Sequence, residues 1–201
     1  TGYLLQRLKP VRNIMYLMIL LSIFLVIAAM VSYLIIFSSQ RRLVQRLAYR
    51  DSLTGGANYA YFKRQLLTKS RIRCGYIISM DIQHFSNITI TAGSAAADDM
   101  IKKTWELIKQ SIKDNEYAAR VRDDYFVMLL NMSSDADVSK RLEQLSDEVH
   151  DLAIAYDAPG VRACFGIYPM EDITALDDSY NKAKIGCAFA KERHDKCYAF
   201  Y

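Results

Sequence analysis

An apolar run over residues 14–37, with no charged residue and no proline, constrains the fold of this chain more than any other feature. A helix over this run, rising roughly 1.5 Å per residue, is about 36 Å long and crosses a hydrocarbon core about 30 Å thick. A buried helix of a soluble domain is a poorer match, because it keeps a polar face over such a length. A cleaved signal peptide has a shorter apolar region, and no Ala-x-Ala sequence follows here. The sequence therefore predicts one transmembrane helix in a lipid bilayer.

The charges that flank the run bear on its orientation. Residues 1–50 contain basic side chains but no acidic one, and the basic residues are slightly more numerous after the run than before it. Such an excess marks the cytoplasmic side of a span. We therefore expect residues 1–13 to be an extracytoplasmic flank that is truncated, and residues 38–50 to be a helical linker. Residues 51–201 are then a cytoplasmic domain at the inner membrane of a single-pass chain.

The composition of the remaining chain narrows the function classes. Although the whole chain has 26 Lys and Arg against 22 Asp and Glu, residues 51–201 hold more acidic than basic side chains. A nucleic-acid-binding surface is therefore not expected. The cysteines form no Cys-x-x-Cys pair and no zinc spacing, so we interpret them as reduced, mostly buried thiols. They are Cys74, Cys164, Cys187 and Cys197.

Hydrophobic periodicity and turn residues predict alternating helices and strands after residue 50. The expected helices cover 58–69, 95–112, 138–155 and 178–191. The expected strands cover 75–80, 117–121, 125–130, 161–168 and 197–201, with the second and third joined as a hairpin. The first of these strands is expected to end at Asp81. This order indicates an α+β fold with a mostly antiparallel central sheet and helices packed on it.

Several short segments of residues 51–201 resemble, in order and spacing, the motifs of GGDEF domains, the diguanylate cyclase family. Residues 51–62 resemble D-x-L-T-G-x-x-N-R-x-x-F, and residues 81–85 resemble D-x-D-x-F. Residues 92–98 resemble Y-G-H-x-x-G-D, and residues 120–126 fall where R-x-G-G-D-E-F belongs. Residues 164–167 replace S-x-G-I, and Ala190 with Lys191 begins A-K-x-x-G-R-N. The resemblance implies a nucleotidyl-cyclase-like fold with a ferredoxin-like palm.

The resemblance also implies a chemistry. The family makes cyclic di-GMP from two GTP molecules, one held by each domain of a homodimer, with Mg2+ or Mn2+ as the cation. Positioning and metal charge supply most of the acceleration in such phosphoryl transfer. By resemblance, Asp81 and Asp124 are the metal ligands, and Asp124 is also a possible base. Asp98 is the carboxylate that reads guanine, and Lys191 contacts phosphate.

The chain departs from the family pattern at the signature itself. Arg122 and Asp123 replace both glycines, Tyr125 replaces the second acid, and only Asp124 and Phe126 match the rest. Arg122 puts a long side chain where the family has bare backbone, and Asp123 adds negative charge toward a triphosphate. We therefore assign no catalytic residue and expect the cyclase to be inactive.

Further departures affect guanine and product binding. Ser86 and Thr89 replace a lysine and a guanine-reading asparagine, and residues 194–196 replace the final Gly-Arg-Asn. The inhibitory R-x-x-D site of the family falls on Lys113 to Glu116. Lysine lacks the bidentate fork of arginine, so we do not expect this remnant to bind product as a feedback inhibitor.

Three functions remain open. The first is a membrane-anchored, degenerate GGDEF domain that regulates or dimerises in cyclic di-GMP signalling, followed by an EAL phosphodiesterase domain. In this reading Asp81, Asp124 and Arg122 retain weak, metal-dependent affinity for GTP. The second is an active membrane-bound diguanylate cyclase with an atypical signature. The third is a structural scaffold that binds no nucleotide.

Overall fold

The computed structural model describes residues 2–69, 75–193 and 195–201, with side chains except those of residues 2–13 and 38–47. The chain divides into two compact units, Thr1–Arg46 and Leu47–Tyr201. Cys74 and His194 lie outside the described residues.

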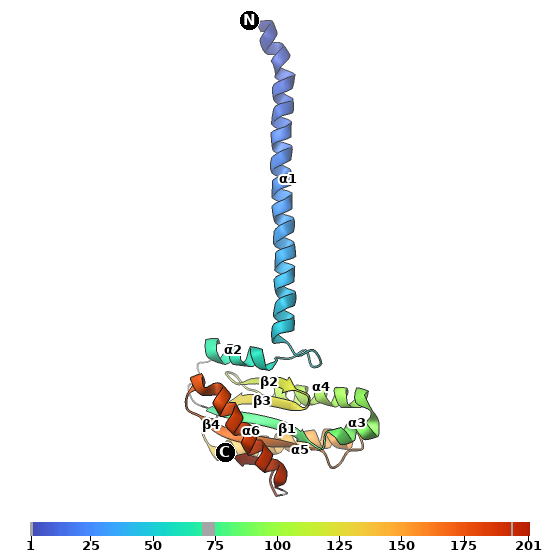
Figure 1. Cartoon of the computed structure of the whole chain (residues 1–201), viewed down its shortest axis with the longest axis vertical. Helices are drawn as coiled ribbons and strands as arrows, with labels where there is room; N and C mark the ends of the chain where they lie inside the picture. Colours follow the sequence, from blue (N-terminus) through green and yellow to red (C-terminus); the bar gives the residue numbers. More distant parts are fainter. Residues whose placement is uncertain (1, 70–74, 194) are drawn as a thin grey trace. The chain divides into compact units, whose positions relative to one another are not determined.

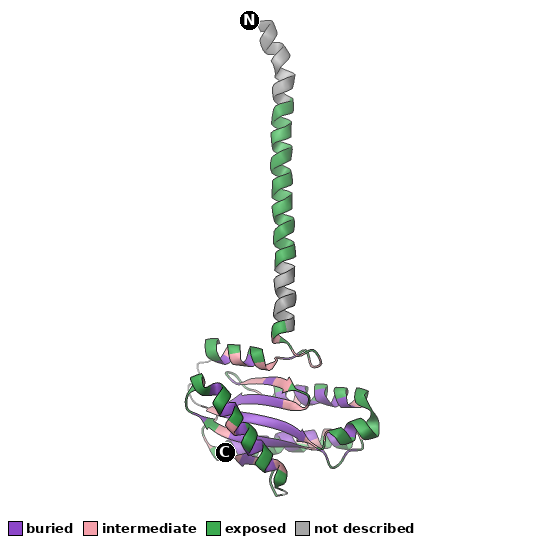
Figure 2. Ribbon diagram, viewed as in Figure 1, coloured by how far each residue is buried: buried purple, intermediate pink, exposed green. Residues whose placement is uncertain are grey.

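The first unit consists of α1 (Gly2–Tyr49), whose last residues belong to the second unit. The segment Ile14–Phe37 within it is long and apolar enough to cross a membrane and is a candidate span. Its side chains are exposed within the structure, as the green segment of Figure 2 shows. The predicted span and the predicted helical linker are therefore parts of one uninterrupted helix.

The second unit is a five-stranded sheet with helices on both faces (Figure 1). Its strands are β1 (Gly75–Gln83), β2 (Tyr117–Arg122), β3 (Tyr125–Leu130), β4 (Arg162–Met170) and β5 (Tyr198–Phe200). Its helices are α2 (Tyr59–Lys69), α3 (Ser86–Ala92), α4 (Ser94–Ser111), α5 (Asp135–Ile154), the 3-10 turn η1 (Ile173–Ala175) and α6 (Leu176–Glu192). The strand order is β2-β3-β1-β4-β5, antiparallel except for the parallel pair β4 and β5. The predicted α+β class and mostly antiparallel sheet are confirmed.

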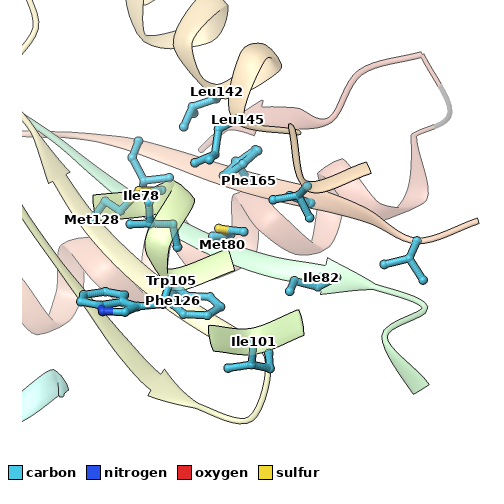
Figure 3. Close-up of a cluster of buried hydrophobic side chains, with 14 of the residues drawn as sticks. Ile78, Met80, Ile82, Ile101, Trp105, Phe126, Met128, Leu142, Leu145 and Phe165 are labelled. Atoms are coloured by element: carbon cyan, nitrogen blue, oxygen red, sulfur yellow. The ribbon is translucent and has the colours of Figure 1, made fainter. Parts of the chain in front are cut away.

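Successive side chains of a strand point to opposite faces of the sheet, and this alternation sorts the buried residues into two cores. On one face, Ile78, Met80 and Ile82 of β1 pack with α4 and α5 (Figure 3). On the other face, Ile77 packs with residues of α2 and α6. Asp81 shares the parity of Ile77, so its side chain points to the face that α6 covers.

Two glycines let α6 lie directly on β4. A Cβ atom on Gly166 would lie 1.8 Å from the carbonyl oxygen of Ala183 and 2.1 Å from the amide nitrogen of Cys187. A Cβ atom on Gly186 would lie 2.9 Å from the carbonyl oxygen of Ala199. The backbone of α6 thus reaches the sheet itself, and this approach brings the C-terminal end of α6 toward β1.

The structure corrects two local predictions. β1 does not end at Asp81 but continues to Gln83, so Asp81 lies inside a strand, paired with Tyr125 of β3 and Cys164 of β4. No helix was predicted between residues 81 and 95, yet α3 forms there. The buried side chain of Ile88 explains α3, because packing against the core outweighs the weak helix propensity of its threonines.

Candidate functional site

The centre of the candidate site is the carboxylate of Asp81, which is buried in the middle of the sheet. The residue is only 3% exposed. Asp81 lies between β3 and β4, which pair with β1 on either side. Its side chain points to the face of the sheet that α6 covers. A buried carboxylate without a partner is costly, and the structure supplies two partners.

The first partner is Lys191, in the last turn of α6. Its Nζ lies 2.5 Å from Oδ2 of Asp81. Burial alone would lower the pKa of Lys191, but the carboxylate of Asp81 raises it above its ordinary value. The ion pair therefore keeps Lys191 charged and neutralises Asp81.

The second partner is Tyr125, whose hydroxyl donates a hydrogen bond to Asp81. This bond and burial raise the pKa of the phenol. The same ring lies 5.7 Å from Nζ of Lys191 and 5.7 Å from the guanidinium carbon of Arg122. Tyr125 stands where a second acid was expected, and it binds the first acid instead.

A glutamine fixes the end of α6 above this pair. Nε2 of Gln83 donates to the carbonyl oxygen of Lys191 at 3.1 Å. Nε of Arg162 donates to Oε1 of Gln83 at 3.0 Å, and Nη2 of Arg162 donates to the carbonyl oxygen of Arg193 at 2.7 Å. Sequence analysis missed Gln83 and Arg162. The available signal was Gln83 itself, because it replaces the second acid of D-x-D-x-F.

The hairpin between β2 and β3 carries the altered signature. Asp123 has a φ of +44°, a left-handed conformation that favours glycine and that aspartate tolerates better than most residues. Arg120 holds the turn, donating through Nε and Nη2 to the carbonyl oxygen of Asp123 at 2.9 and 2.7 Å. Its Nη1 also contacts Oδ1 and Oδ2 of Asp51 at 2.9 and 3.0 Å, which ties the hairpin to the turn after α1. Arg122 and Asp123 are exposed at the tip.

Asp124 is the second carboxylate near Asp81. Burial raises its pKa, the negative charge of Asp81 raises it further, and the resulting value is about 6. Lys191 offsets part of this effect. The structure thus brings together four of the residues that sequence analysis singled out: Asp81, Asp124, Tyr125 and Lys191.

These residues do not fit a resident Mg2+ or Mn2+. Such ions prefer several oxygen ligands, and the described ranges contain no group of three or more His, Cys, Asp or Glu side chains placed to hold one. Of the two carboxylates at the site, Asp81 already binds an ammonium group and a hydroxyl. The metal role of Asp81 and Asp124 stays a prediction, and in this structure Asp81 contacts Lys191 and Tyr125 instead.

The residues at the positions expected to read guanine lie on the surface of the domain. Asp98 is exposed near the start of α4, and Thr89 is exposed in α3. The roles that resemblance gives them stay predictions.

Of the two residues expected to be the remnant of the inhibitory site, one lies on the surface and the other is buried. Lys113 is exposed, whereas Glu116 is 7% exposed and receives both Nη atoms of Arg141 at 2.8 and 2.7 Å. Glu116 also accepts the backbone N–H groups of Lys113 and Asn131. All of its bonds are internal, so this carboxylate serves the fold. A cleft of about 600 Å³ opens beside the pair.

Comparison with known proteins agrees with this geometry. The family model of the diguanylate cyclase GGDEF domain matches residues 48–197. The chain belongs to this family, whose cyclases generally use Mg2+ or Mn2+ and whose domains are typically cytoplasmic. Among curated relatives, the probable diguanylate cyclase DgcT of Escherichia coli K12 is 30% identical over 128 residues, which are 62% of this chain and 27% of that protein. The cyclic di-GMP phosphodiesterase NbdA of Pseudomonas aeruginosa is 29% identical over 113 residues, which are 52% of this chain and 14% of that protein.

Solved structures show the same fold. The coiled coil and GGDEF domain of DgcB from Caulobacter crescentus, solved in complex with c-di-GMP, superposes with a TM-score of 0.69. It is 19% identical, and the match covers 87% of this chain and 97% of that one. The diguanylate cyclase SiaD of Pseudomonas aeruginosa superposes with a TM-score of 0.66 at 20% identity, over 85% of this chain and 68% of that one. The chain thus contains a cyclase-type GGDEF domain of cyclic di-GMP signalling.

Proposed function

We propose that this chain is a membrane-anchored GGDEF domain that has lost cyclase activity and acts as a regulatory module in cyclic di-GMP signalling. The span 14–37 anchors it in the inner membrane, and the domain lies in the cytoplasm as part of a homodimer. It senses GTP or dimerises, and it controls a downstream EAL phosphodiesterase domain.

One observation carries the proposed loss of activity: side chains of the domain itself bind Asp81, the residue that is expected to be a cation ligand. Asp81 binds Lys191 and the hydroxyl of Tyr125. Phosphoryl transfer relies on cations that bridge and neutralise phosphate oxygens. Asp81 is occupied and Tyr125 replaces an acid, so Asp124 is the remaining carboxylate. One carboxylate alone is a weak binding site for a divalent cation.

The signature hairpin supports the same conclusion. Arg122 and Asp123 are exposed at its tip, where the family has glycines that let the backbone approach phosphates. The guanidinium of Arg122 is suited to pair with a phosphate, which favours binding without turnover. Asp98 alone reads the base, since Thr89 lacks the paired donor and acceptor of an asparagine amide.

The regulatory role draws support from the relatives. One of them, NbdA, is named a cyclic di-GMP phosphodiesterase, and the match covers only 14% of its length. A domain like this one therefore occurs within a longer protein that degrades the messenger. An inactive cyclase domain that shifts its state with ligand occupancy would suit such a setting.

The second candidate function, an active diguanylate cyclase, is favoured by one observation. Asp124 survives in the signature next to Asp81 and Lys191, and a probable diguanylate cyclase is 30% identical to the chain. For this function Lys191 would have to release Asp81 before that carboxylate could hold a cation.

An activity assay separates the two candidates. We predict that the full chain in detergent micelles, given GTP with Mg2+ or Mn2+, forms no cyclic di-GMP that mass spectrometry detects above a sample without protein. The Asp124→Ala variant is the matched control and should give the same result. Product from the wild type that disappears in Asp124→Ala would establish the active cyclase instead.

A further inference from the structure

We propose that the ammonium group of Lys191 has taken over the place of the divalent cation, as a built-in cation that Gln83 and Arg162 hold on Asp81 and that excludes Mg2+ and Mn2+. This inference rests on the proposed function. Because the family motif also has a lysine at position 191, the physical cause of the lost activity lies in its neighbours: Tyr125 replaces an acid beside Asp81, and Gln83 replaces another and holds the end of α6. The inference also goes further, since it names the group that keeps metal out and the residues that position it.

The contacts of Asp81 leave little room for a metal. Its side chain is 4% exposed, and Nζ of Lys191 lies 2.5 Å from Oδ2. The hydroxyl of Tyr125 adds a second donor to the same carboxylate. A metal ion that binds Asp81 must displace both donors and leave the ammonium without its partner. It must also approach a positive charge in a partly buried place, where repulsion is poorly screened.

The end of α6 is fixed so that Lys191 stays on Asp81. Gln83 follows Asp81 by two positions in the same strand, and its amide N–H binds the carbonyl oxygen of Lys191. Arg162 of β4 holds both Gln83 and the carbonyl oxygen of Arg193. The thiol of Cys164 also donates to Oε1 of Gln83, at 3.4 Å. The backbone is therefore tied on both sides of residue 192.

Such bonds matter because a helix terminus otherwise frays. The last carbonyl groups of a helix lack partners within the helix, and side chains that satisfy them anchor its final turn. Gln83 and Arg162 provide these donors from two neighbouring strands. The close contact of Gly166 and Gly186 sets the height of α6 above the sheet. Gln83 and Arg162 are thus positioning residues, and Lys191 is the residue that occupies the site.

Direct binding of Mn2+ alone tests the built-in cation. The full chain in detergent micelles is titrated with Mn2+ while electron paramagnetic resonance counts the free ion. We expect weak binding by the wild type and an affinity about tenfold or more higher in Lys191→Met, because the carboxylate is freed and a positive charge is removed. Lys184→Met, an exposed lysine of the same helix, is the matched control and should behave as the wild type.

Two results of the Mn2+ titration would contradict the proposal. A wild type that binds Mn2+ as tightly as Lys191→Met overturns the proposal, and so does a folded Lys191→Met variant that gains no affinity. A measurement on the wild type alone covers the case in which this variant does not fold. Under the proposal, added Mn2+ leaves the amide resonances of residues 81–83 unbroadened in NMR spectra, and selective broadening there contradicts it.

A separate variant tests whether Gln83 positions Lys191. Gln83→Leu removes the bond to the carbonyl oxygen of Lys191 but leaves Lys191 and Asp81 in place. We expect its Mn2+ affinity to lie between those of the wild type and Lys191→Met. A merely structural role would lower thermal stability without changing Mn2+ affinity, and that result would remove Gln83 from the proposal.

Cyclic di-GMP synthesis, measured on the same samples, distinguishes failure of this inference from failure of the proposed function. A wild type that binds Mn2+ tightly and makes no product contradicts only the built-in cation. Product formation by the wild type contradicts the inactive reading itself.

Discussion

At the scale of single residues, the chain reuses family positions for structural bonds. Glu116 stands at the position where the resemblance predicts the acid of an inhibitory site, and it forms a buried, bidentate pair with Arg141. Burial alone would raise the pKa of Glu116, but the hydrogen bonds from Arg141 and the backbone N–H of Lys113 lower it below its ordinary value. The carboxylate is therefore ionised at neutral pH and stabilises the turn at 113–116.

This pair gives a prediction for stability and pH. Arg141→Met leaves Glu116 charged and buried, and we expect the free energy of unfolding of residues 47–201 at neutral pH to fall by about 3 kcal/mol. Because the folded pKa of Glu116 is depressed, its contribution in the wild type is present above its unfolded pKa and is lost as the pH falls through the folded pKa. Urea unfolding at several pH values measures both effects.

The exposed neighbour Lys140 offers the control. Lys140→Met should change the free energy of unfolding by less than about 0.5 kcal/mol and keep the acid dependence of the wild type. If Arg141→Met were equally harmless, the pair would not be a stabilising feature of the domain.

At the scale of elements, the contact between β4 and α6 decides the geometry of the site. Gly166 and Gly186 allow backbone to meet backbone, and the end of α6 then reaches Asp81. A side chain at this contact would push α6 away from the sheet. The glycine that the family motif S-x-G-I requires is thus explained by packing, and it survives in a chain whose signature glycines are gone.

We predict that Gly166→Ala destabilises the domain severely, by about 3 kcal/mol or more. The added Cβ would lie 1.8 Å from a backbone oxygen, so no flexible side chain can move aside to accommodate it. Gly160→Ala is the matched control, because a Cβ there meets nothing within 4 Å. Thermal unfolding followed by circular dichroism compares the two. Equal melting temperatures for both variants would show that α6 can shift on the sheet.

Local patterns predicted the elements well and the contacts poorly. Isoleucine-rich strands, amphipathic helices and the 122–124 break identified the sheet and its hairpin, because these signals are short in range. The contacts of Lys191 with Asp81 and Gln83 could not be predicted from local patterns. Gln83 and Lys191, for example, are 108 positions apart, and only the folded chain brings them together. The sequence shows that Tyr125 replaces an acid. Its bond to Asp81 could not be predicted, because it depends on the register of β1 and β3.

At the scale of the whole molecule, one long helix carries a candidate span and continues to the first turn of the domain. The turn after α1 is bonded to the signature hairpin through Asp51 and Arg120. Arg120 in turn holds the carbonyl oxygen of Asp123. A change in the last residues of α1 therefore has a short bonded route to the altered signature, as the proposed regulatory role requires.

The last prediction concerns the orientation of this helix. The small excess of basic residues after 14–37 predicts that the N-terminus lies outside and that residues 41–201 lie in the cytoplasm. Gln6→Cys and Ser52→Cys are made separately, and spheroplasts are treated with a maleimide that does not cross membranes. We expect Gln6→Cys to react in intact spheroplasts and Ser52→Cys to react only after lysis. The unsubstituted chain, treated in parallel, is the control for the native cysteines, because Cys197 is only half-buried whereas Cys164 and Cys187 are buried. Labelling of each variant is counted as the excess over this control. Labelling of Ser52→Cys in intact spheroplasts would put the domain outside, away from GTP, and would end the proposed role in cyclic di-GMP signalling.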